Sequence, residues 1–201
     1  MTKSSKKIYK RADTFLKKAQ SYGYRSRSSL KLLEIQKRDK FIQAGSRVVD
    51  LGCSPGGWSQ VTKQIIGKKG KVLGIDIKKM EPIQGVNFIQ KSIGKLTSRD
   101  FEEENIFSPF DIVLSDIAPN ISGIRYRDDS LMIELLSKIQ LFIDNNLIVD
   151  GSSLIKVFQG ESLDMMMIYM KSNFQKVRIR KPDSSRTNSK ETYILGLNKK
   201  T

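Results

Sequence analysis

The feature of this sequence that most restricts its fold is a regular alternation of short apolar segments with helical patterns. Apolar runs of strand length recur along the chain, and between them lie segments with apolar residues at helical spacing. The expected strands are 46–53, 70–77, 86–90, 110–119 and 152–160, and the expected helices are 57–67, 130–147 and 162–174. Strands that alternate with helices form a parallel sheet with helices on both faces, which is an α/β fold.

The end of the chain departs from this alternation. Two further apolar segments, 175–181 and 191–198, are separated by a polar loop without a helical pattern. Strands joined in this way pair as a hairpin, so we expect one antiparallel strand in a mostly parallel, seven-stranded sheet. No repeat, linker or low-complexity block divides the chain, and we therefore expect a single domain over residues 1–201.

The charge of the chain predicts a polyanionic partner. The formal net charge is +15, and residues 1–31 hold ten Lys and Arg against one acid, Asp13. A nucleic acid fits this excess, although a lysine-rich solvated surface with no partner stays open as an alternative. No apolar run reaches transmembrane length and the N-terminus lacks the apolar stretch of a signal peptide, so no membrane partner is expected.

Two residue counts exclude whole classes of chemistry. The chain has no histidine, which removes histidine general bases, Ser-His and Cys-His pairs and histidine-ligated metals, and no metal site is expected. The single cysteine, Cys53, excludes a disulfide within the monomer. This fits a reducing compartment, and we expect a cytoplasmic protein.

A glycine-rich turn follows the first expected strand in "VVDLGCSPGGWSQ". Gly52, Gly56 and Gly57 allow a sharp turn and a close approach of the backbone to a ligand, although many such turns are only tight turns. The spacing differs from that of a dinucleotide or P-loop site. Asp50 would repel phosphate and suits a cation such as S-adenosylmethionine, and Asp76, at the end of the second strand, can accept hydrogen bonds from both ribose hydroxyls.

Charged residues recur at the ends of the expected strands. Asp116 follows the fourth strand, Lys156 interrupts the apolar run "SSLIKVFQG", and Glu191 begins the last strand. Lys31 lies in a helical pattern ahead of the first strand. A lysine among apolar residues is costly unless a function requires it. The alternative is that these residues are ordinary salt-bridged or solvated charges.

Several long motifs resemble those of the FtsJ/RrmJ (RlmE) methyltransferases, in order and with similar spacing, from about Asp13 to Asn198. These motifs are "RSRSSLKLLEIQ", "VVDLGCSPGGWSQ", "SDIAPNISG", "IKVFQGE" and "RKPDSSRTNSKETYIL". The resemblance implies a Rossmann-like S-adenosylmethionine-dependent methyltransferase fold. It also implies methylation of a ribose 2′-hydroxyl, of a uridine in large-subunit ribosomal RNA, on the RNA or on the large ribosomal subunit.

The resemblance also carries over individual residues. The family's Lys-Asp-Lys-Glu tetrad falls on Lys31, Asp116, Lys156 and Glu191, with Lys156 as proton acceptor or orienting group. Its cofactor contacts fall on Gly56, Trp58, Asp76 and Asp116. One position departs from the pattern, because Ser92 stands where the family has an acid that contacts the adenine amino group.

Two further expectations concern partners. The basic segment 1–30, together with Arg25, Arg27 and the loop 180–186, should contact RNA phosphates, and the protein should act as a monomer. The rival hypotheses are a non-catalytic RNA-binding ribosome-assembly factor on the same fold and a nicotinamide-dependent oxidoreductase. The glycine spacing counts against the second of these.

Overall fold

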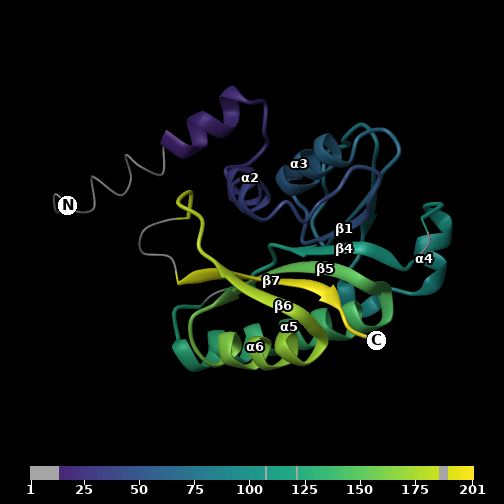
Figure 1. Cartoon of the computed structure of the whole chain (residues 1–201). Coiled ribbons are helices and arrows are strands. Elements are labelled where there is room, and N and C mark those ends of the chain that lie inside the picture. The colour runs from purple at the N-terminus through teal and green to yellow at the C-terminus, as the bar shows by residue number, and fades with distance from the viewer. Residues whose placement is uncertain (1–13, 107, 121, 186–189) are drawn as a thin grey trace.

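The centre of the molecule is a seven-stranded sheet with the order β3-β2-β1-β4-β5-β7-β6 (Figure 1). The computed structural model describes residues 14–106, 108–120, 122–185 and 190–201. The strands are β1 Arg47–Leu51, β2 Lys71–Asp76, β3 Val86–Gln90, β4 Phe110–Ser115, β5 Leu147–Phe158, β6 Phe174–Arg180 and β7 Glu191–Lys199. The helices are α2 Ser28–Asp39, α3 Gly57–Ile66, α4 Ser98–Glu103, α5 Arg125–Asn146 and α6 Glu161–Asn173, with a 3-10 turn at Ile93–Lys95 and a helical segment over residues 14–21.

The pairing of the strands confirms the predicted topology. Strands β1 to β5 pair in parallel, whereas β7 runs antiparallel to both β5 and β6. The strand order reverses between β1 and β4, and in open α/β sheets ligands bind beside such a reversal, at the carboxyl ends of the strands. Because β7 is antiparallel, its first residue, Glu191, lies at this same edge.

The core divides between the two faces of the sheet, because successive residues of a strand point to opposite sides. Val48 and Leu154 pack in the cluster under α2 and α3, whereas their neighbours Val49 and Ile155 pack in the cluster with α5 and α6. Figure 1 shows these two helix pairs on opposite faces of the sheet, as the sequence predicted. None of the helices in the described ranges is long and apolar enough to cross a bilayer.

Several element ends differ from the predicted ones. The expected strand 110–119 ends at Ser115, because the chain leaves the sheet to form the loop that carries Asp116. The long helix begins at Arg125 rather than at residue 130, and β5 begins at Leu147 rather than at 152. The short helix α4 has no apolar periodicity that would have predicted it, and a capping box of Thr97 and Asp100 starts it.

Candidate active site

The glycine turn between β1 and α3 packs too tightly for side chains. Gly52 has φ +74°, and a Cβ there would collide with the side chain of Ile117, in the loop after β4. Gly56 has φ +108° at the start of α3, where Met80 and Ile83 lie against it. The turn therefore brings the loops after β1, β2 and β4 together at the carboxyl edge of the sheet.

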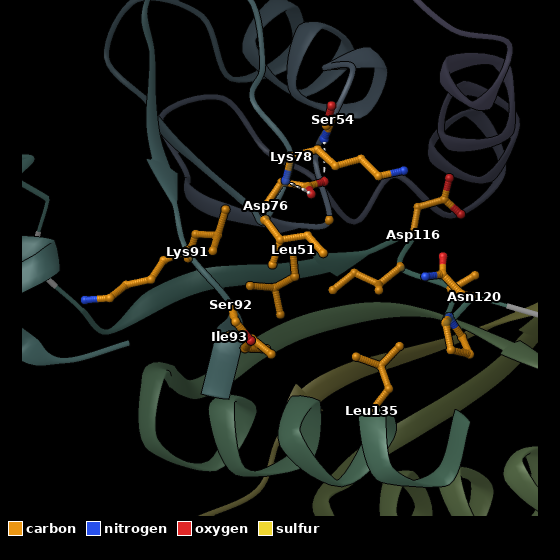
Figure 2. Close-up of a pocket in the computed structure, with 16 residues that line it drawn as sticks. Leu51, Ser54, Asp76, Lys78, Lys91, Ser92, Ile93, Asp116, Asn120 and Leu135 are labelled. Atoms are coloured by element: carbon orange, nitrogen blue, oxygen red, sulfur yellow. Dashed lines mark hydrogen bonds between the residues drawn. The ribbon is translucent and has the colours of Figure 1, made fainter. Parts of the chain in front are cut away.

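A cavity of about 360 Å³ opens at this edge, beside the glycine turn (Figure 2). Its walls come from the loops after β1, β2, β3 and β4, with Leu135 of α5 at its base. Four of the predicted cofactor residues line it: Gly52, Asp76, Ser92 and Asp116. Apolar walls with a few placed carboxylates are typical of a small-molecule site, and they suit an adenosine that carries a positive charge.

Asp76 is oriented by the backbone around it. Its Oδ2 accepts a hydrogen bond from the Ser54 amide at 2.9 Å, and its Oδ1 accepts one from the Lys78 amide at 2.8 Å (Figure 2). A carboxylate has about four acceptor positions, so two remain for ribose hydroxyls. Asp76 lines the cavity, and its ribose-binding role stays a prediction.

The wall after β3 carries no acid among its described residues. Ser92 stands where the family pattern predicted an acid. The neighbouring Lys91 ammonium lies 2.7 Å from the Asp100 carboxylate. The Asp100 carboxyl also accepts hydrogen bonds from Thr97, and these contacts lower its pKa to about 2, with the Lys91 bond as the largest cause. Asp100 is therefore bound to Lys91 and to the start of α4, and the Ser92 hydroxyl stands in this wall in place of the predicted acid.

Asp50 lies behind the cavity rather than in its wall. It is fully buried, and its Oδ2 accepts a hydrogen bond from the Ser59 hydroxyl at 2.6 Å. Its Oδ1 has no hydrogen-bond partner among the described residues. Burial, with smaller contributions from the charges of Asp116 and Asp76, raises the pKa of Asp50 to about 7. A cation in the cavity would favour the charged form of this carboxyl.

Trp58 is a core residue outside the lining of the cavity, and its predicted cofactor contact stays a prediction. Its indole Nε1 donates to the Ser28 carbonyl at 2.8 Å, and its ring packs on Tyr193 with centroids 5.7 Å apart. Gly56 and Gly57 also lie outside the cavity lining. A Cβ on Gly57 would meet the hydroxyls of Ser26 and Ser29, so this glycine allows α3 to approach the start of α2.

The four residues of the predicted tetrad lie close together, and Asp116 is the one that lines the cavity. The Lys156 Nζ lies 3.1 Å from the Asp116 Oδ1 and also donates to the Asp116 carbonyl. The Lys31 Nζ lies 2.5 Å from the Glu191 Oε1. The lysine side chains are only 10% and 6% exposed, so both ammonium groups are held largely out of water. Residues far apart in the chain thus form two adjacent buried ion pairs.

Tyr193 joins the two ion pairs and was not singled out from the sequence. Its hydroxyl donates to the Asp116 Oδ1 at 2.9 Å and accepts from the Lys31 Nζ at 3.2 Å. Burial, followed by the charges of Asp116 and Glu191, raises its pKa well above 10.0 and keeps it a neutral donor. Its position two residues after Glu191 places it on the same face of β7, and this alternation was the available signal.

The charges of the tetrad balance. Burial alone would raise the pKa of Glu191, but the nearby Lys31, a hydrogen bond from Ser185 and the charge of Lys156 outweigh it and hold that pKa below 4.5. Two cations and two carboxylates therefore share one poorly hydrated region. Such groups are held in fixed positions, because separating any pair would leave a buried charge without a partner.

Arg25 makes structural contacts that the sequence did not predict. Its guanidinium donates to the carbonyls of Pro55, Glu81 and Pro82, and its backbone amide donates to the Gln60 side chain. These bonds tie the segment before α2 to the glycine turn and to the loop after β2. The sequence could not show these carbonyl partners, and the contact of Arg25 with RNA phosphate stays a prediction.

The comparisons with known proteins agree with this architecture. A family model described as FtsJ-like methyltransferase matches residues 24–199. The ribosomal RNA large subunit methyltransferase E of Stenotrophomonas maltophilia (strain R551-3) is 42% identical to this chain, over 99% of this chain and 96% of the relative. The relative of the same name from Marinobacter nauticus is 43% identical, over 91% of this chain and 89% of its own length.

Solved structures add the same fold. The crystal structure of a ribosomal RNA methyltransferase from Plasmodium falciparum matches with a TM-score of 0.78 and 33% identity, over 88% of this chain and 98% of that one. Aeropyrum pernix fibrillarin, solved with bound S-adenosyl-L-methionine, matches in fold with a TM-score of 0.58 and 15% identity, over 87% of this chain and 75% of that one. With the glycine turn, the cavity and the motifs in one continuous match, the chain belongs to the FtsJ-like methyltransferase family.

Proposed function

We propose that this protein is an S-adenosylmethionine-dependent RNA methyltransferase that modifies a ribose 2′-hydroxyl, of a uridine, in large-subunit ribosomal RNA. Membership of the FtsJ-like methyltransferase family and relatives named ribosomal RNA large subunit methyltransferase E support the reaction and the RNA class. The observation that carries the proposal is the position of Lys156, which is held by the carboxylate and the carbonyl of Asp116, a residue that lines the cavity.

The cavity residues fit S-adenosylmethionine, which would supply an electrophilic methyl group. Asp76 would bind the ribose hydroxyls, and the apolar side chains of Ile75 and Ile93 would contact the adenine. Asp50 would add a negative charge behind the glycine turn once a cation stabilises its ionised form. Asp116 would face both ligands, because it lines the cavity and also holds Lys156.

The remaining residues would prepare the acceptor hydroxyl. A ribose hydroxyl is a weak nucleophile, so removal of its proton must accompany attack. Lys156 would accept that proton or hold the oxygen in line, and a lysine accepts a proton only where burial and nearby cations disfavour its charged form. Lys31, Glu191 and Tyr193 would fix the position of Lys156 through Asp116 and balance its charge.

The whole chain, 1–201, would act as one methyltransferase domain, as a monomer in the cytoplasm, on the RNA or on the large ribosomal subunit. The basic segment 1–30 would contact RNA, although residues 1–13 lie outside the described part of the chain. The net charge of +15 supports a polyanionic substrate.

The test is methylation of undermodified large ribosomal subunits and of their free RNA with methyl-labelled cofactor, followed by mapping of the labelled ribose. We expect one labelled 2′-O-methyl group, with the wild-type protein active on one of these two substrates. Retention of the RNA without transfer of label, together with no heat on titration of S-adenosylmethionine, would instead support a non-catalytic RNA-binding protein.

A further inference from the structure

A second cavity, of about 590 Å³, lies outside the site described above. It is enclosed by the helical segment 14–21, the C-terminal half of α2 and the chain after β6. Its lining includes Phe15, Lys18, Lys37, Arg38, Lys181 and Asp183. Figure 1 shows the loop after β6 rising beside α2 toward this first helical segment. The volume lies within the range of small-ligand sites, and the lining mixes cations with an aromatic ring.

The cations of this cavity are available to a ligand. Lys18, Lys37, Arg38 and Lys181 make no ion pair among the described residues, although they share one cavity. The adjacent Arg180 is different, because its guanidinium binds the Asp39 carboxylate at 2.7 Å. Cations placed together without internal partners repel one another, and an anionic ligand would relieve that repulsion.

The wall of the cavity is held in place before any ligand binds. The Glu34 carboxylate accepts hydrogen bonds from the amides of Asp183 and Ser184, at 2.7 and 3.2 Å. These bonds fasten the chain after β6 to α2, so the lysine and arginine side chains extend from fixed backbone. Two carboxylates, Glu34 and Asp183, also line the cavity, against the four cations that make no ion pair among the described residues.

The cavity adjoins the tetrad through shared elements. Arg38 follows Lys31 by seven residues on α2, so both lie on one side of this helix, about 10 Å apart along its axis. On the other wall, Arg180 of β6 pairs in register with Tyr193, whose hydroxyl joins the two ion pairs. A nucleic-acid strand that reaches the tetrad therefore has this cavity beside its path.

We propose that this cavity binds a neighbouring nucleotide of a single-stranded RNA segment while the target ribose occupies the tetrad. Lys37, Arg38 and Lys181 would contact its phosphates, and the half-buried Phe15 ring would stack on its base. Single strands are favoured over a duplex, because turning a base out of a duplex would also cost the energy of unpairing and unstacking it. This inference rests on the proposed function, since it identifies where the same substrate is held.

The first experiment compares two double variants that remove equal charge. Arg38→Ala/Lys181→Ala alters the cavity, and Lys69→Ala/Lys171→Ala removes exposed lysines that precede β2 and β6, at the opposite edge of the sheet. The cavity variant should raise the KM for RNA about tenfold, leave kcat at saturation unchanged and reduce the salt slope of RNA binding by about 1.4. The control variant should match the wild type in all three quantities.

Equal effects of the two variants would mean that only net charge matters, and an unchanged KM and salt slope in the cavity variant would also overturn the proposal. A failure of the proposed function can be distinguished from a failure of this inference, because the wild type would then transfer no methyl group. RNA binding, measured directly for the wild type and the two double variants, still tests the cavity in that case.

The second experiment tests stacking with Phe15→Tyr and Phe15→Leu. The tyrosine keeps an aromatic face, so its affinity for a single-stranded RNA should equal that of the wild type. The leucine keeps apolar packing but should bind about tenfold more weakly. Equal affinities of the two variants would refute base stacking, provided that thermal melting shows the same Tm for both.

Discussion

The two halves of the active site hold their charges in different ways. On the acceptor side, two lysines and two carboxylates form ion pairs that Tyr193 links. On the cofactor side, Asp76 is held by backbone amides, and Asp50 has an oxygen with no partner among the described residues. The first arrangement fixes positions, whereas the second leaves acceptor capacity for a ligand. Changes on the acceptor side should therefore reduce turnover, and changes on the cofactor side should alter affinity.

The largest expected effect separates the two halves directly. Lys156→Arg should lower the rate of methyl transfer by about 10²- to 10⁴-fold, because a guanidinium cannot accept a proton and has a different shape. The affinity for S-adenosylmethionine should stay within about twofold, because Lys156 does not line the cofactor cavity. Single-turnover transfer of labelled methyl and calorimetric titration measure the two quantities. Near-normal turnover would show that Lys156 is not the proton acceptor.

A smaller effect is expected from removing the hydroxyl that joins the ion pairs. Tyr193→Phe keeps the ring against Trp58 but leaves Asp116 and Lys31 each without one hydrogen bond. The rate should fall about tenfold, equivalent to about 1.4 kcal/mol, with little change in cofactor affinity. Its pH–rate profile should also shift, which a purely structural loss would not cause. A profile that overlays the wild type would leave Tyr193 with a packing role alone.

On the cofactor side, the affinity should depend on pH through Asp50. Burial raises its pKa to about 7, so the carboxyl is largely protonated at pH 6, and a cationic cofactor favours its ionised form. Affinity for S-adenosylmethionine should rise about fivefold between about pH 6 and 7.5 in the wild type and stay flat in Asp50→Asn. Ser59→Ala should move the midpoint to higher pH, because the Ser59 hydroxyl stabilises the charged form.

The stability of the cofactor-free protein should show the opposite sign for the same group. Between 3.8, the ordinary pKa, and about 7, the unfolded chain is ionised at Asp50 while the folded chain keeps the proton. The unfolded state then binds fewer protons, so this contribution lowers the free energy of unfolding as the pH rises through that window. Denaturant unfolding of the wild type and Asp50→Asn at several pH values measures this contribution. The same dependence of the free energy of unfolding on pH in both proteins would contradict the raised pKa of Asp50.

The smallest expected effect concerns the wall after β3. Ser92→Asp would restore the acid that the family has at this position and add a charged acceptor for the adenine amino group. Affinity for S-adenosylmethionine should rise about threefold, with turnover at saturation unchanged. Ser92→Ala is the matched control and should weaken binding slightly. A weaker complex with Asp than with Ala would show that the adenine does not reach this wall.

Sequence reasoning succeeded where a pattern repeats or a motif is long. The alternation of apolar and helical segments predicted the parallel sheet with helices on both faces, and the polar loop after residue 181 predicted the antiparallel hairpin. Sequence reasoning did not show that the Trp58 ring packs inside the core or that the Arg25 guanidinium binds three carbonyls. Helix α4 was missed, because its start depends on one capping box rather than on periodicity.

The sequence alone determined the α/β architecture, the hairpin at the end of the sheet and the identity of the residues that the family's tetrad would require. These depend on local periodicity and on motifs that contiguous residues carry. Only the tertiary structure decided which charge pairs with which, that Tyr193 joins the pairs, and that Asp50 lies behind the cavity. Hydrogen bonds and burial depend on distances between residues remote in the chain, and the folded sheet sets those distances.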